Sequence, residues 1–115
     1  MTSSTGKRTA KQGEVYLTDV IFRDLQGGSK LRPVIVVSKD IVIDIDVIVA
    51  SVTSAQPRSE YDIVIEHWEE AGLLKPSIAR TSKLLTISQA VLGNKLGELN
   101  PIDLNMVLQK CRELF

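Results

Sequence analysis

The chain has few of the residues that cross-link or brace small domains. Its 115 residues include one cysteine, Cys111, and one histidine, His67. A single cysteine cannot form an internal disulfide, and no cluster of Cys and His residues indicates a metal site. Aromatic residues make up only 4% of the chain, so the hydrophobic core must consist mainly of Val, Ile and Leu. We therefore predict a protein that uses neither a metal nor another cofactor.

Long hydrophobic runs are also missing. Every apolar run is much shorter than the roughly 20 residues that span a membrane. The N-terminus has no apolar segment of the kind found in secretory signals. These absences predict a cytoplasmic protein with no membrane partner. The hydrophobic content of 43% still supports one folded domain with a modest core.

Neither sign of charge is in excess, because 14 basic residues balance 14 acidic ones. All 14 acidic residues but only 11 of the basic ones follow residue 12, so the rest of the chain carries a net charge of −3. We predict that residues 1–12, which are small, polar and basic, form a disordered tail, and that residues 13–115 form one domain. A strongly basic domain would indicate nucleic-acid binding, so any such binding must use a local patch here.

Short β-branched segments separated by turn residues predict a mainly β protein. Residues 89–99 mix a helical turn with a short strand. The pattern predicts about five strands, at residues 13–22, 32–38, within 39–53 and ending near Thr53, 61–68 and 78–88.

A C-terminal helix closes the pattern. Asn100 can cap it, Pro101 suits its first position, and Asp103 lies in its first turn. Apolar residues then recur at helical spacing and should pack on the sheet, namely Leu104, Val107, Leu108, Cys111, and Leu114 or Phe115. Short strands with a closing helix predict a small, twisted, partly closed β-barrel.

The stretch GGSKLRPVIVVS, residues 27–38, allows two interpretations. It is not a Walker A phosphate loop, because that motif needs a different spacing and a following helix. It is either a hairpin turn or a phosphate-binding site. Arg32 precedes Pro33 directly, and Arg80 and Lys83 stand among hydroxyl residues in PSIARTSK. Arginine forks and hydroxyls bind phosphate oxygens well, which favours the second interpretation.

The order and spacing of several motifs resemble the MazF/PemK-type toxins of bacterial toxin–antitoxin systems. The motifs are GEVYLTD, GGSKLRPVIVVS, VIVASVTS, YDIVIE, GLLKPSIARTSKLLTIS and LGELNPIDLNMVLQKCREL, and they cover nearly all of residues 13–115. The resemblance implies a small SH3-like β-barrel of the MazF/PemK/CcdB type with a C-terminal helix. It also implies a homodimer that cleaves single-stranded RNA without a metal and is silenced by the C-terminal segment of an antitoxin.

The resemblance also implies site residues. Arg32, Thr53 and Arg80 match catalytic positions of the family. The substrate-binding positions that follow from it are Gln26, Ser29, Lys30, Ser54, Ser82 and Lys83. Ser82 departs from the family pattern because PemK-like members have a catalytic aspartate there, and Gln26 stands where some members have histidine. The general base is therefore not identified.

Several of these residues also have structural interpretations. Arg80 could pair with Glu66 or Asp62, and Thr53 could simply end a strand. His67 is more typical of a structural histidine than of a base, and Asp44 and Asp46 are typical of a solvated sheet edge.

Two other functions stay open. One is a MazF-like module that binds RNA or a peptide without cleavage. The other is an SH3-like adaptor, although the chain has few aromatic residues for a proline-binding groove.

Overall fold

The computed structural model describes residues 10–19, 31–39 and 46–115. Within these ranges the chain forms one antiparallel sheet of six strands, with strand order β4-β5-β3-β2-β1-β6. The elements are β1 (Glu14–Thr18), β2 (Arg32–Val36), β3 (Asp46–Thr53), β4 (Asp62–Val64), β5 (Ile78–Ser88), the 3₁₀ turn η1 (Gln89–Val91), β6 (Leu92–Glu98) and α1 (Pro101–Glu113). The predicted mainly β fold with a C-terminal helix is confirmed.

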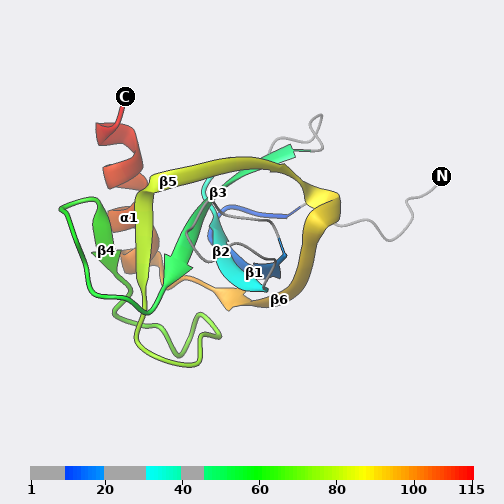
Figure 1. The fold of residues 1–115 in the computed structure, drawn as a ribbon, viewed down its shortest axis with the longest axis horizontal. Helices are drawn as coiled ribbons and strands as arrows, with labels where there is room; N and C mark the ends of the chain where they lie inside the picture. Colours follow the sequence, from blue (N-terminus) through cyan, green and yellow to red (C-terminus); the bar gives the residue numbers. More distant parts are fainter. Residues whose placement is uncertain (1–9, 20–30, 40–45) are drawn as a thin grey trace.

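The sheet curls into a partly closed barrel because β5 is long and bends. Its first residues pair with both β4 and the end of β3, and its last residues pair with the start of β3. The register between β3 and β5 shifts after Ala50, which is typical of a β-bulge. Figure 1 shows β5 crossing above the sheet and continuing through η1 into β6. Because β6 pairs with β1, the chain after β5 reaches the opposite edge of the sheet.

Two apolar cores lie on the two faces of this curved sheet. Val15 and Ile35 face α1, which contributes Val107 and Cys111 to that core. Tyr16, the next residue along β1, faces the other core, which also contains Ala10, Val34, Val36, Val47 and Val49. The alternation along each strand therefore separates two packed layers.

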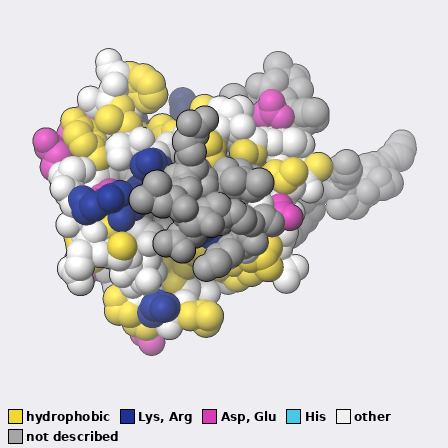
Figure 2. All heavy atoms as spheres, in the orientation of Figure 1, with side chains coloured by type: hydrophobic (Ala, Val, Ile, Leu, Met, Phe, Trp, Pro, Cys, Tyr) yellow, Lys and Arg dark blue, Asp and Glu magenta, His cyan; other side chains and the backbone are white. Residues whose placement is uncertain are grey.

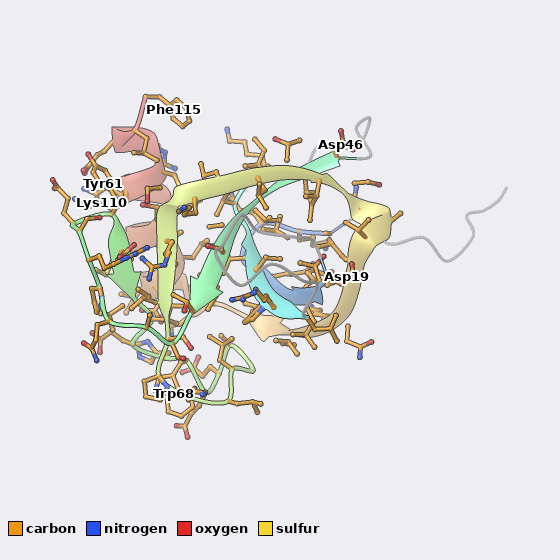
Figure 3. The ribbon with its side chains drawn as sticks, in the orientation of Figure 1. Asp19, Asp46, Tyr61, Trp68, Lys110 and Phe115 are labelled. Carbon is orange, nitrogen blue, oxygen red and sulfur yellow. The ribbon has the colours of Figure 1, made fainter. Side chains whose placement is uncertain are left out.

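The C-terminal helix begins as predicted. The side chain of Asn100 accepts a hydrogen bond from the backbone N–H of Ile102 at 2.8 Å, and Pro101 occupies the first turn. Val107 and Cys111 are buried, whereas Phe115 is almost fully exposed beyond the end of the helix (Figure 3). Among the helices of the described ranges, none is long and apolar enough to cross a membrane.

The fourth strand is shorter than the predicted 61–68 and ends at Val64. The N–H of Ile65 still bonds to the carbonyl of Ser77 at 3.0 Å. The next two backbone N–H groups, of residues 66 and 67, instead donate to the buried carboxylate of Asp103 at 3.2 and 2.9 Å. A carboxylate on α1 therefore takes the donors that a strand would have used, and the chain turns there.

Two further differences concern the strand count and the N-terminus. The described sheet has six strands rather than about five, because residues 92–98 form a full strand against β1. Ala10, a residue of the predicted tail, is buried, and its N–H donates to Oε1 of Gln89 at 2.6 Å. The side chain of Gln12 donates to the carbonyl of Val37. Ala10 and Gln12 therefore pack with the barrel.

Candidate active site

The candidate site is a cavity of about 440 Å³ where the start of β2 meets the end of β3. In the β2–β3 register, Val34 pairs with Ser51. Continued for two more residues, this register brings Arg32 opposite Thr53, and both residues line the cavity. Sheet pairing therefore brings together two residues that lie 21 positions apart in the sequence.

The cavity is lined by apolar residues and by a smaller set of polar ones. Its apolar lining includes Leu17, Leu31, Pro33, Val52, Leu73 and Leu96. Its polar lining residues are Arg32, Thr53, Ser54, Lys75 and Ser77. The part of the lining that the structure describes contains two cations and three hydroxyls but no carboxylate and no imidazole. Such a lining suits an anionic group with an attached apolar or aromatic ring.

The local hydrogen bonding leaves the hydroxyl of Thr53 able to donate. The backbone N–H of Ala55 donates to Thr53 Oγ1 at 3.2 Å, so this oxygen acts as an acceptor within the protein. The hydroxyl hydrogen remains available for an acceptor in the cavity. Pro33 restricts the backbone directly after Arg32, at the start of β2.

The third wall of the cavity is the turn at residues 72–77. Gly72 has a φ of 84°, and a Cβ at this position would run into the carbonyl of Leu96 on β6. The N–H of Leu73 donates to the carbonyl of Trp68 at 3.1 Å. The hydroxyl of Ser77 donates to the carbonyl of Lys75 at 2.8 Å. These contacts hold the turn, which lies at the lower edge of Figure 1, against the barrel.

Arg80, the third predicted catalytic residue, does not line this cavity. Its Nη1 lies 2.9 Å from Oδ2 of Asp62, and the two side chains are only 12% and 2% exposed. The same carboxylate oxygen accepts the backbone N–H of Arg58 at 2.7 Å. Of the two acidic partners proposed from the sequence, the structure selects Asp62, because β4 and β5 pair these two residues directly.

The other predicted site residues divide into three groups. Ser54 lines the cavity with Arg32 and Thr53. Ser82 and Lys83 are exposed on β5 and are not among the residues that line it. Gln26, Ser29 and Lys30 lie outside the described residues, as does Asp44.

Lys75 lines the cavity although it is not among the site residues predicted from the sequence. A signal for it was present, because Lys75 precedes Pro76 just as Arg32 precedes Pro33. His67 has the structural role that the sequence favoured, since its Nδ1 lies 3.2 Å from Asp103 Oδ2. Across the described ranges, no three His, Cys, Asp or Glu side chains gather in a way that could hold a metal ion.

Figure 2 shows the same face of the molecule as Figure 1, with side chains coloured by type. Lysine and arginine side chains lie next to hydrophobic ones, including at the lower edge of this view. Cationic groups are therefore interspersed with apolar surface on this face.

Comparisons with known proteins agree with this architecture. No curated protein sequence matches the chain. Solved structures do match, including an endoribonuclease from a mycobacterial species, with a TM-score of 0.72 and 18% identity over 95% of this chain and 93% of that one. An endoribonuclease in complex with its cognate antitoxin, also mycobacterial, gives a TM-score of 0.71 and 21% identity over 92% and 97% of the two chains.

A crystal structure of MazF (Form-I) from Deinococcus radiodurans gives a TM-score of 0.72 and 16% identity over 94% of this chain and 97% of that one. At these identities the matches establish the fold, and they confirm the predicted MazF-type barrel with its C-terminal helix. A family model described as "PemK-like, MazF-like toxin of type II toxin-antitoxin system" matches residues 11–115. The chain therefore belongs to the PemK-like, MazF-like toxin family of type II toxin–antitoxin systems.

Proposed function

We propose that the protein is a metal-independent endoribonuclease that cleaves single-stranded RNA, including mRNA, at the cavity between β2 and β3. The observation that carries the proposal is the convergence of Arg32 and Thr53 on one cavity with a mainly apolar lining. Family membership supports the same activity, as do the structural neighbours described as endoribonucleases.

The proposed chemistry uses the nucleophile that RNA carries. The 2′-hydroxyl attacks the adjacent phosphorus, and the products are a 2′,3′-cyclic phosphate and a 5′-hydroxyl. Arg32 stabilises the negative charge of the phosphorane oxygens through its guanidinium fork. Thr53 donates its hydroxyl hydrogen to a phosphate oxygen. Because Leu17, Val52 and other apolar side chains reduce the local dielectric, these interactions are stronger in the cavity than in bulk water.

The test is cleavage of a long single-stranded RNA by the purified protein in excess EDTA. We expect discrete fragments that carry a 5′-hydroxyl and a cyclic phosphate. Sequencing the fragment ends then gives the cut site. Intact RNA at high enzyme concentration, with folding verified by circular dichroism, would contradict the proposal.

The proposed partners are an antitoxin and a second copy of the chain, acting in the cytoplasm. One structural neighbour is a complex with its cognate antitoxin, which supports an antitoxin partner here. We propose that the C-terminal segment of that antitoxin silences the protein. We also propose that RNA crosses the interface of a homodimer.

Two observations favour a second candidate, an RNA- or peptide-binding module without cleavage. Arg80 is paired with Asp62 outside the cavity, and Ser82 replaces the carboxylate that PemK-like members have. RNA binding without cleavage in the EDTA experiment would support this candidate.

A further inference from the structure

Cleavage of an RNA backbone needs a proton at the leaving 5′-oxygen, because an alkoxide is a poor leaving group. A guanidinium holds its proton too tightly to supply it, so Arg32 suits charge stabilisation instead. Serine and threonine hydroxyls are weaker acids than an ammonium group. Of the described cavity-lining side chains, Lys75 is therefore the best proton donor.

The turn that carries Lys75 is held from several directions. The Ser77 hydroxyl binds the carbonyl of Lys75 itself, and the Ser77 carbonyl accepts the N–H of Ile65 at 3.0 Å. Pro76 restricts the backbone immediately after Lys75. Gly72 packs against the backbone of Leu96 at the start of the turn. An exposed lysine is thereby fixed at its backbone while its side chain borders the cavity.

The ammonium of Lys75 also differs from those of Lys95 and Lys110 in its environment. Lys95 is bound by Glu14 and Glu98, and Lys110 by Glu60 and Glu113. In the described part of the chain, Lys75 has no acidic partner within ion-pair distance. Its charge and its proton are therefore not already committed to a carboxylate.

We propose that Lys75 is the general acid of the reaction, an assignment that rests on the proposed ribonuclease function. The 2′-oxygen forms a bond to phosphorus and releases its proton to solvent. The bond between phosphorus and the 5′-oxygen breaks, and its electron pair goes to the 5′-oxygen, which takes a proton from the Lys75 ammonium. The resulting amine regains a proton from water. In this scheme Arg32 stabilises the developing charge and Lys75 transfers the proton.

The test replaces the leaving oxygen by sulfur. A short RNA with the mapped cut site is made in two forms, with an ordinary bond or with a bridging 5′-sulfur at the scissile position. A thiolate leaves without protonation, so the sulfur substrate does not need the acid. In single-turnover assays, Lys75→Ala should cleave the oxygen substrate about 10²–10⁴-fold more slowly than wild type. It should cleave the sulfur substrate at close to the wild-type rate.

Three variants make the result specific. Lys75→Arg keeps the charge but cannot give up its proton readily, so it should stay slow on the oxygen substrate and fast on the sulfur substrate. Arg32→Ala should be slow on both substrates. Lys39→Ala removes an exposed lysine beyond the other end of β2 and should match wild type on both.

Each other outcome is informative. If Lys75→Ala cleaves the oxygen substrate at the wild-type rate, or is equally slow on both substrates, Lys75 is not the acid. Recovery of the oxygen-substrate rate by Lys75→Arg would also overturn the assignment, since it would show that charge alone suffices. If folded wild-type protein cleaves neither the long RNA nor the two short ones, the proposed function itself fails and the assignment falls with it.

Discussion

Two arginines that the sequence presents in similar ways have different environments in the folded protein. Arg32 borders a cavity at the start of β2. Arg80 lies next to a carboxylate that is 2% exposed, so its charge is largely neutralised by Asp62. Opposite charges held this close in a buried setting form a structural link between β4 and β5. The same side chain therefore borders a cavity at one position and links two strands at the other.

Arg32→Ala should preserve the fold, because Arg32 at the start of β2 contributes little to the core. It should lower the single-turnover cleavage rate by about a hundredfold or more, the effect of losing one transition-state stabiliser. Arg32→Lys should recover little, since an ammonium cannot reproduce the two-pronged contact of a guanidinium. A wild-type rate for folded Arg32→Ala would mean that residues 27–33 are only a hairpin turn.

Arg80→Met should destabilise the protein by about 3–5 kcal/mol, because it leaves the buried carboxylate of Asp62 without its cation. Adding Asp62→Asn should recover part of this loss, since the amide oxygen can still accept the N–H of Arg58. Urea unfolding measures both effects. Below its unfolding temperature the double variant should cleave RNA like wild type. Unchanged stability combined with lost cleavage would instead make Arg80 catalytic.

At the scale of elements, the turn at residues 66–77 connects the helix, the sheet and the cavity. Its first residues bond to Asp103 on α1 through their backbone N–H groups. Its middle packs against β6, where Gly97 also lies too close to Ala71 to accept a side chain. Two glycines therefore allow backbone-to-backbone contact between the turn and β6.

Gly72→Ala tests this contact against a matched control. Gly13 and Gly72 both have positive φ, at 93° and 84°. A Cβ on Gly13 meets only the flexible side chain of Leu104, whereas one on Gly72 meets a backbone carbonyl. Gly13→Ala should cost about 1–2 kcal/mol from its backbone conformation. Gly72→Ala should cost more and should also slow cleavage. Equal losses in thermal unfolding would argue against the close contact.

At the scale of the whole molecule, barrel closure depends on β1 meeting β6. Glu14 on β1 is buried and lies 2.9 Å from the ammonium of Lys95 on β6. It also accepts hydrogen bonds from the hydroxyl of Tyr16 and the N–H of Lys11, each at 2.8 Å. Burial by itself raises the pKa of Glu14, but these bonds and the Lys95 charge outweigh it and lower the pKa.

The lowered pKa of Glu14 predicts a pH dependence of stability. A carboxyl group whose pKa is lower in the folded state stabilises that state above its unfolded pKa, about 4.3. The stabilisation is lost as the pH falls through the folded value. Glu14→Gln should therefore be less stable than wild type at neutral pH, and the difference should shrink below about pH 4. Glu98→Gln, which removes the exposed partner of Lys95, should show a smaller effect in urea unfolding.

The molecule should also assemble with itself. Leu74 and Phe115 are 94% and 96% exposed, and Ile102 and Met106 expose apolar surface one turn apart on α1. Exposed apolar side chains of this size are often covered in an oligomer. Light scattering at micromolar concentration should give about twice the 12.7 kDa of one chain. A mass of one chain would contradict the homodimer.

Local signals in the sequence determined the elements that depend on neighbours along the chain. The Asn100–Pro101 start of the helix, the apolar face with Val107 and Cys111, and the long strand at residues 78–88 follow from capping, periodicity and β-branched content. Together with the motif order, these signals were enough to predict the barrel and its family. Arg32 and Thr53 were implied as site residues by the family resemblance alone, and their roles in the reaction stay predictions.

Only the tertiary structure decided which distant groups meet. Asp103 takes the backbone donors at residues 66 and 67 and so ends β4, although nothing near residue 64 in the sequence indicates this. Asp62 pairs with Arg80 through the β4–β5 register, and the turn packed on β6 brings Lys75 to the cavity. Local sequence sets backbone preference, whereas partners in space depend on register and packing across the whole chain. For that reason only the folded structure shows that Lys75 borders the cavity and that Arg80 does not.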